Sequence, residues 1–188
     1  MLDGPTASLP LTLSGPNGSL QIEIGPLRDL EVRPLFDLFG AVIAAGEGYA
    51  HAAPLTWASF EETWLVPTTA VVAARSEGGL VGAYYLKPNG PGRVAHVANA
   101  GYVVAAKARR RGIARALVVD SIERARLCGF DAMQFNLVFA DNPARPLYEA
   151  LGFEVVGRLP KVISGQDALI YFRSLSPASA APAGAAEA

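Results

Sequence analysis

The sequence predicts one α/β domain in which helices flank a mixed, mostly antiparallel central sheet. Three observations lead to this fold class. Short apolar segments with strand character alternate with amphipathic segments of helical length. Residues 94–105 are nearly uncharged, as a strand in the middle of a sheet should be. Residues 112–128 are amphipathic with a helical period, and the pattern stops at Gly129, a residue that favours helix ends.

The predicted elements follow the order β-α-α-β-β-β-α-β-α-β-β. Residues 19–24 alternate as a strand, and residues 27–45 carry apolar side chains at helical spacing. Thr56 is expected to cap a second, short helix that ends at residue 65. The remaining predicted elements are a hairpin of strands 69–74 and 80–86, strand 94–105, helix 112–128, strand 133–139, helix 143–151, and closing strands 153–163 and 168–173.

The two ends of the chain differ in composition from the segment between them. Residues 1–18 are rich in Gly, Pro, Ser and Thr, and we interpret them as an N-terminal arm or loose strand. Residues 176–188 are rich in Ala, Pro and Ser, which predicts a disordered tail. Residues 19–175 are therefore expected to form the single domain.

Composition excludes several classes of protein. The 188 residues suffice for one sizeable core, and the net charge of −1 does not suit a dedicated nucleic-acid binder. One cysteine excludes a disulfide framework and a CxxC metal site, and two histidines are too few for a histidine zinc site. No apolar run reaches the ~18 residues of a membrane span. We expect a soluble, cytoplasmic protein without a metal, a membrane partner or a nucleic-acid partner.

The segment KARRRGIAR, residues 107–115, places five cations around Gly112. It lies between the predicted central strand and the following helix. Such a segment could be a solvated turn, a nucleic-acid patch or a phosphate-binding loop. Arginines oppose the dipole at a helix N-terminus, so an anion is expected to complete the arrangement. Gly112 and the small Ala114 let the backbone approach a phosphate closely. We therefore favour the phosphate-binding loop.

Two motifs give the chain a resemblance to a known family. RRRGIA, residues 109–114, matches the [QR]xxGx[GA] signature of the GNAT superfamily of N-acetyltransferases. DNPARPLYEALGF, residues 141–153, is similar to the family's second signature, and the order of elements matches over residues 20–173. The resemblance implies a GNAT-like fold and direct transfer of an acetyl group from acetyl-CoA to an amine, without an acyl-enzyme. It also makes a homodimer an expectation.

The resemblance assigns the acetyl-CoA site to the end of the central strand and the start of the helix after it. Backbone N–H groups of residues 110–114 would hold the pyrophosphate, and the neighbouring arginines would support it. Asn142 is carried over although the motif asparagine itself is replaced by Asp141. The predicted cofactor residues are Val103, Val104, Arg109, Arg110, Arg111, Gly112, Ile113, Ala114, Arg115 and Asn142.

Tyr148 is the family's candidate general acid toward the departing thiolate. Its pKa of about 10 in water makes proton transfer to a thiolate of pKa near 8.5 feasible. Leu147 and Leu151 occupy the expected core face of their helix, so Tyr148 is expected on the cleft side; a core tyrosine is the alternative. The base stays open between His96, Glu47 and a water chain.

A narrower resemblance concerns the amine acceptor. YLKPNGPGRVAHVANAGYVV, residues 85–104, and AMQFNLVFADNPA, residues 132–144, are similar to the branch that includes the fungal azetidine-2-carboxylate N-acetyltransferases. It implies that Asn99 and Asn136 lie in the acceptor site, the alternative being hydrogen bonds to neighbouring loops. Tyr49 and His51 could close over the same cleft. This branch has tryptophan where the chain has Tyr148.

The predicted function is an acetyl-CoA-dependent N-acetyltransferase that acts on a small amine, for which the narrower resemblance favours an amino acid or cyclic imino acid. A non-catalytic module that binds acetyl-CoA is the first alternative. Binding of nucleic acid through the arginine run is the second alternative.

Overall fold

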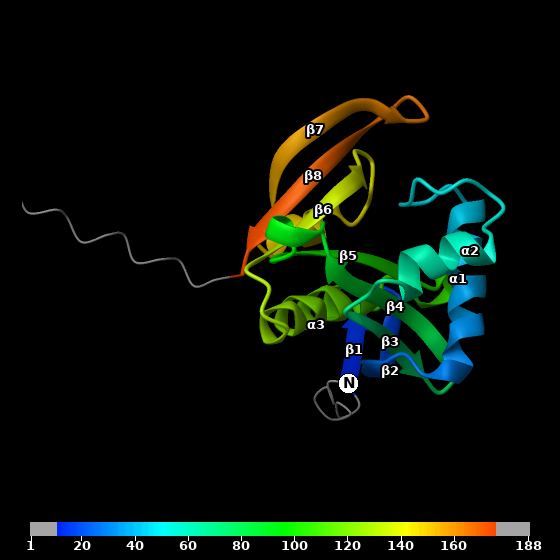
Figure 1. Ribbon diagram of the computed structural model, residues 1–188. Helices are drawn as coiled ribbons and strands as arrows, with labels where there is room; N and C mark the ends of the chain where they lie inside the picture. The colour runs from blue at the N-terminus through cyan, green and yellow to red at the C-terminus, as the bar shows by residue number, and fades with distance from the viewer. Residues whose placement is uncertain (1–10, 176–188) are drawn as a thin grey trace, which may run out of the picture.

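The computed structural model describes residues 11–175, which form one eight-stranded sheet with helices on both faces (Figure 1). The predicted tail, residues 176–188, and residues 1–10 of the predicted arm lie outside the described residues. The strands are β1 (Leu11–Gly15), β2 (Gly18–Pro26), β3 (Ala70–Ser76), β4 (Gly79–Pro88), β5 (Val97–Val104), β6 (Ala132–Phe139), β7 (Glu154–Ile163) and β8 (Gln166–Ser174). The α-helices are α1 (Val32–Ala44), α2 (Trp57–Phe60), α3 (Ile113–Leu127) and α4 (Arg145–Ala150).

The order of strands in the sheet is β1-β2-β3-β4-β5-β6-β8-β7. Only β5 and β6 run parallel, and every other neighbouring pair is antiparallel. The α/β class and the mixed, mostly antiparallel sheet are therefore confirmed. Of the two interpretations of residues 1–18, an arm or a loose strand, the described part forms a strand: β1 pairs with β2 across the turn at residues 15–18.

Short helical turns modify the predicted bounds. The second helix is shorter than expected, because α2 ends at Phe60 and the π-helical turn η2 (Glu61–Leu65) follows it. Thr56 caps α2 as predicted, since its hydroxyl accepts from the N–H of Ser59 at 3.2 Å. The long central strand begins late, at Val97, after the 3₁₀ turn η3 (Gly92–Val94). The other turns are η1 (Asp29–Glu31) and η4 (Ala106–Ala108).

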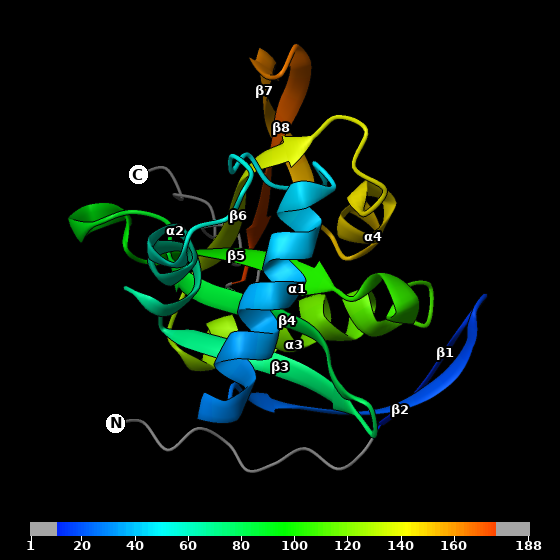
Figure 2. The same cartoon turned by 90° about the vertical axis from the view of Figure 1, so that its right-hand side faces the viewer.

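The helices enclose two apolar cores, one on each face of the sheet. The larger core joins α3 and the strand residues that alternate on its side, such as Tyr84, Leu86 and Ala100. The smaller core joins α1, α2 and η2 with the intervening residues Tyr85 and Val103. Figure 2 shows α1 crossing the front of the sheet. Because neighbouring residues of a strand point to opposite faces, alternate side chains of β4 and β5 belong to the two different cores.

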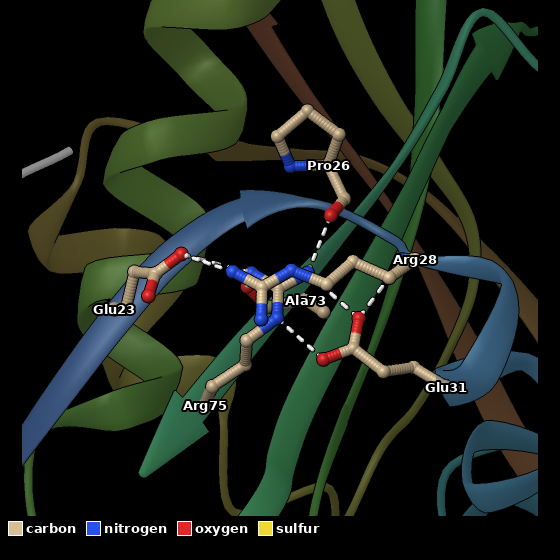
Figure 3. Close-up of polar contacts among 6 residues, drawn as sticks. All are labelled: Glu23, Pro26, Arg28, Glu31, Ala73 and Arg75. Carbon is tan, nitrogen blue, oxygen red and sulfur yellow. Dashed lines mark hydrogen bonds and ion pairs between the residues drawn. The ribbon is translucent and has the colours of Figure 1, made fainter. Parts of the chain in front are cut away.

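A buried ion pair fastens the start of α1 to β2 and β3 (Figure 3). Arg75 donates to both carboxylate oxygens of Glu31, one of them at 2.7 Å, and to the carbonyl of Pro26. The Arg28 N–H also donates to Glu31, at 2.9 Å. Burial alone would raise the pKa of Glu31, but the bonds from Arg75 and Arg28 hold that pKa below its usual value. The buried ion pair between Glu31 and Arg75 therefore fixes the start of α1 against the sheet.

The parallel strands β5 and β6 separate soon after they meet. They pair only at Val97 with Ala132 and Ala98 with Met133, whereas β8 pairs with the other edge of β6 from Ala132 to Phe139. In Figure 1, β6, β8 and β7 lean away from β5. The result is a fork between two strands in the middle of the sheet. No helix among residues 11–175 has the length and apolar character needed to cross a membrane.

Candidate active site

A cavity of about 240 Å³ opens at the N-terminal end of α3. Its lining residues are Val104, Ala108, Arg109, Arg110, Gly112, Ile113, Ala114, Arg115 and Leu147. Most of the predicted cofactor residues thus meet at one cavity. Val103 and Arg111 are not among the lining residues, and the side chain of Val103 is buried in the core beneath α1.

The loop before α3 has the backbone geometry of an anion site. Gly112 precedes the first helical residue with φ of 85°, a left-handed conformation that favours glycine. Its carbonyl accepts the N–H of Ala116 at 3.1 Å, which begins the helix ladder. The N–H groups of Ile113, Ala114 and Arg115 come too early in the helix to have acceptors within it. They can bind an anion.

The turn between β1 and β2 packs against the back of this loop. Asn17 donates from its backbone N–H to the carbonyl of Arg110 at 3.2 Å and from its side chain to the carbonyl of Arg109 at 3.1 Å. Arg110 itself has φ of 61°, which is rare for an arginine. In a trans peptide the N–H points away from the C=O. Fixing these two carbonyls on the hairpin therefore turns the N–H groups of Arg110 and Arg111 away from the hairpin.

This support was not predicted from the sequence, in which residues 1–18 were interpreted as an arm or loose strand without a contact to the loop. Gly15 lies so close to the loop that a Cβ would overlap the Arg110 carbonyl oxygen and lie 2.9 Å from the Arg111 Cα. The local signal was the Pro-Asn-Gly turn at residues 16–18 between two short alternating segments. Its contact with the loop could not be predicted, because Asn17 and Arg109 are 92 residues apart.

The arginines of the loop have different surroundings. Arg109 forms an ion pair with Glu47 at 2.6 Å and donates from Nε to the carbonyl of Val104 at 3.3 Å. The bond from Arg109 lowers the pKa of Glu47, so this candidate base is an engaged carboxylate. The Nε of Arg111 is buried and has no hydrogen-bond partner within residues 11–175. Arg110 and Arg115 line the cavity.

Tyr148 lies at the fork between β5 and β6. Its ring packs 6.4 Å from that of Tyr102 on β5 and 4.9 Å from that of Phe135 on β6. The two sides of α4 are less distinct than predicted: Leu147 packs against the core and also lines the cavity, whereas Tyr148 is buried with 8% exposure. Its ring is held among the aromatic rings of Phe135, Phe153 and Tyr171. Burial, and to a lesser extent Tyr171, raise the pKa of Tyr148 well above its usual value.

The two predicted acceptor asparagines lie at the same fork. Asn99 follows the last paired residue of β5 and donates to the carbonyl of Gln134 at 2.9 Å, which joins the separating strands. The exposed Asn136 donates to Asn89 at 2.7 Å and accepts from the Gln134 side chain at 2.8 Å. Both residues are thus hydrogen-bonded to neighbouring groups, and the second amide hydrogen of Asn99 is available to a ligand.

Two further predicted residues lie away from the cavity. Asn142 accepts from the N–H of Ala144 at 2.8 Å, which supports the start of α4, and the cavity lining does not include it. His96 is exposed, and its ring contacts the carbonyl of Arg93 at 2.9 Å. It precedes β5 and, by strand alternation, projects to the opposite face from Asn99. The structure does not bring His96 to the fork.

The loop between α1 and α2 covers the face of β5 on which Asn99 lies. Tyr49 donates to the carbonyl of Tyr102 at 3.1 Å and occupies the space left by Gly101, where a Cβ would meet the Tyr49 hydroxyl at 2.7 Å. His51 contacts the Thr63 hydroxyl at 2.9 Å through Nε2. That hydroxyl donates to the carbonyl of Ser59, so His51 must donate from Nε2.

The second ring nitrogen of His51, Nδ1, is buried and has no hydrogen-bond partner among residues 11–175. Burial and, second, the charge of Lys87 lower the pKa of His51, which favours the neutral ring near pH 7. The sequence analysis placed His51 only in a lid over the cleft.

Comparison with known proteins agrees with this geometry. A model of the acetyltransferase (GNAT) family matches residues 36–153, which is more than half of the chain. The N-acetyltransferase aca1 of Schizosaccharomyces pombe is 39% identical over 97 residues, which is 51% of this chain and 46% of aca1. Protein SPT10 of Saccharomyces cerevisiae is 36% identical over 90 residues, which is 46% of this chain and 14% of SPT10. The matches span less than half the length of either relative.

Solved structures resemble the chain over a larger share of its length. A GCN5-related N-acetyltransferase from Kribbella flavida superposes with a TM-score of 0.76 and 32% identity, covering 81% of this chain and 97% of that one. A phosphinothricin acetyltransferase from Sinorhizobium meliloti, in complex with acetyl-CoA, has the same fold, with a TM-score of 0.73, 18% identity, and coverage of 86% of this chain and 96% of that one. The chain belongs to the acetyltransferase (GNAT) family.

Proposed function

We propose that the protein is an acetyl-CoA-dependent N-acetyltransferase that transfers the acetyl group directly to the amine of a small molecule. The observation that carries the proposal is the cavity at the start of α3, which combines arginines with unpaired N–H groups and lies at the end of the strand that borders the fork. A ligand that fits this arrangement is elongated: its anionic group would bind in the cavity, and a linear arm would extend from there along β5.

The residues present fit the pyrophosphate of acetyl-CoA. The N–H groups of Ile113, Ala114 and Arg115 have no acceptor within α3, so they are free to bind phosphate oxygens. Arg110 and Arg115 line the cavity, where their forks suit phosphate oxygens. Arg109 would contribute its charge while bonded to Glu47. When bound, acetyl-CoA supplies an acetyl group that is already activated as a thioester.

Strand β5 would align the rest of that molecule. From Val104 at the cavity to Asn99 at the fork, the five steps between successive strand residues span roughly 16 Å. Past Ala98 the edge of β5 that faces β6 has no strand partner, so its main chain can pair with the amides of a ligand as an added strand would. This supports binding of the pantetheine arm between β5 and β6.

Tyr148 is the proposed general acid. Its phenol lies between Tyr102 and Phe135 at the fork, beside the line of β5. The raised pKa keeps the phenol protonated at physiological pH, which a donor requires before transfer. The same shift makes complete transfer to a thiolate uphill, so the catalytic contribution is expected to be modest.

For the base we propose a water chain, because the two protein candidates have other surroundings. Glu47 is held by Arg109, and His96 is exposed on the other face of β5. For the acceptor we propose an amino acid or a cyclic imino acid, as the narrower sequence resemblance implies. A homodimer stays a prediction.

The test is release of free thiol from acetyl-CoA with a panel of small amines: azetidine-2-carboxylate, proline, polyamines and aminoglycosides. Thiol release that depends on an amine, matched by acetylated product, is the expected result. A folded protein that binds acetyl-CoA but acetylates none of these amines would favour the non-catalytic binding module.

A further inference from the structure

Lys87 is a half-buried cation without a counterion. It lies near the end of β4, and it takes part in none of the ion pairs found among residues 11–175. Its ammonium donates to the carbonyl of Thr63 at 3.2 Å and lies 4.7 Å from the centre of the Tyr85 ring. Burial lowers the pKa of Lys87, and no neighbouring carboxylate offsets this effect. An ammonium has three hydrogens, so two of them lack a protein acceptor.

The surroundings of Lys87 place it at the candidate acceptor site. Lys87 is directly opposite Asn99 in the antiparallel pair of β4 and β5, so the two side chains lie on the same face within about 5.5 Å at Cβ. Asn99 marks the fork. The covering residues are Tyr49 and His51 from the loop between α1 and α2, and the nearest acid of that loop, Glu47, is bonded to Arg109.

Among residues 11–175, the groups at this site without a full set of partners include two donors, Lys87 and Asn99, and one acceptor, the buried Nδ1 of His51. Lys87 offers two N–H bonds and one positive charge, and Asn99 offers the amide hydrogen that Gln134 does not take. A buried ammonium without an anion is unfavourable, and proteins pair such groups. One cation with an amide donor suits the single charge of a carboxylate. A phosphate group would favour the arginine cluster at the other end of β5.

We propose that Lys87 and Asn99 bind the carboxylate of the acceptor, so that the enzyme selects amines that carry a carboxylate beside the amino group. The inference rests on the proposed acetyltransferase function and specifies its acceptor. A carboxylate held opposite Asn99 lies next to the fork, which brings the attached amine within reach of a thioester between β5 and β6. Tyr49 and His51 would cover the remainder of a small acceptor.

The test uses acceptors that share a ring and an amine and differ in the carboxylate: proline, prolinamide and pyrrolidine. The wild-type protein should acetylate proline with a kcat/KM about 10- to 100-fold above that of prolinamide, the value of a hydrogen bond to a charged group. Lys87→Met should raise KM for proline by a similar factor, leave prolinamide unchanged and remove the preference. Lys87→Arg should recover part of it.

Two controls separate this role from others. Lys161→Met removes an exposed lysine from β7 and should leave the preference intact. If Lys87 only supports Thr63, Lys87→Met should lower the melting temperature. If Lys87 serves to bind a ligand, Lys87→Met should leave the melting temperature unchanged or raise it. A lower melting temperature for Lys87→Met together with an unchanged preference for proline would overturn the inference.

Failure of the proposed function would give a different result. Equal acetylation of proline and prolinamide would refute the carboxylate site and leave the acetyltransferase intact. If none of the three amines is acetylated, the proposed function loses support. Binding of proline and prolinamide to the protein then tests the carboxylate site separately. Proline should raise the melting temperature of the wild-type protein, and prolinamide should not. Neither compound should raise the melting temperature of Lys87→Met. Absence of this difference between the two proteins would refute the carboxylate site.

Discussion

The contact between the N-terminal hairpin and the phosphate-binding loop predicts that Gly15→Ala weakens acetyl-CoA binding from behind the site. The new Cβ would overlap the carbonyl oxygen of Arg110 and lie 2.9 Å from the Cα of Arg111, closer than the 3.0 Å that real Cβ atoms keep. Backbone occupies the space, so no side-chain rotation can relieve the overlap. The loop or the hairpin has to move, by on the order of 1 Å.

The expected magnitude follows from the bonds that such a movement disturbs. The N–H groups of Arg110 and Arg111 are oriented by the carbonyls that Asn17 holds. A hydrogen bond from an N–H to a charged phosphate contributes about 1.5–3 kcal/mol. Loss of one such bond raises the Kd for acetyl-CoA about 10- to 100-fold. Asn17→Ala, which removes one of the two restraints, should have a smaller effect in the same direction.

Isothermal titration of acetyl-CoA measures this Kd, with Gly18→Ala as the matched control. Gly18 lies in the same turn with φ of 91°, and a Cβ there meets nothing within 4 Å. Its replacement strains the hairpin without touching the loop, so stability should fall by about 1–3 kcal/mol while Kd stays near the wild-type value. If Gly15→Ala is folded and binds acetyl-CoA as tightly as Gly18→Ala, the hairpin does not shape the cofactor site.

Four other substitutions test the cofactor loop, the proposed general acid and the buried ion pair. Gly112→Val, at φ of 85°, should abolish the stabilisation of the protein by acetyl-CoA in a thermal shift experiment, while the unliganded protein remains folded. Tyr148→Phe should lower kcat about 10²-fold or less with little change in Kd for acetyl-CoA, and an unchanged kcat under conditions where chemistry limits would remove Tyr148 from the mechanism. Arg75→Met should lower the free energy of unfolding by about 3–5 kcal/mol because it leaves Glu31 buried without its partner. Since the folded pKa of Glu31 is lowered, its contribution is complete above the unfolded pKa of about 4.3 and disappears as the pH falls through the lower folded value; Glu31→Gln should flatten that dependence in chemical denaturation, and an equally steep dependence in the variant would assign it to other groups.

The position of the basic loop before α3 could be predicted because its determinants are local, and binding of phosphate by this loop stays a prediction. Charge, glycine and helix start all fall within residues 107–115, and the strand before them and the helix after them have strong periodic patterns. The cavity lined by Arg110, Gly112 and Arg115 agrees with that prediction. The same reasoning supported the α/β fold, whose elements each have their own pattern.

Contacts between distant segments could not be predicted in this way. The ion pair of Glu47 with Arg109 joins residues 62 apart, and it changes a candidate base into an engaged carboxylate. The burial of Tyr148 could not be predicted, because helix periodicity describes one helix and carries no information about the rings of Phe135 and Tyr171 that pack against it. Lys87 became notable only when its neighbours were known, since a lysine near the end of a strand is ordinary and a half-buried lysine without a counterion is not.

The most direct test of the central claim is to measure thiol release from acetyl-CoA together with the acetylated product, in the presence of proline and in the absence of any amine. The account predicts release of one thiol for each acetylated amine with the wild-type protein, and none with Gly112→Val at the same concentration of acetyl-CoA. Release by Gly112→Val equal to that of the wild-type protein would contradict the phosphate site. Absence of both release and acetyl-CoA binding in the folded wild-type protein would contradict the proposed function itself.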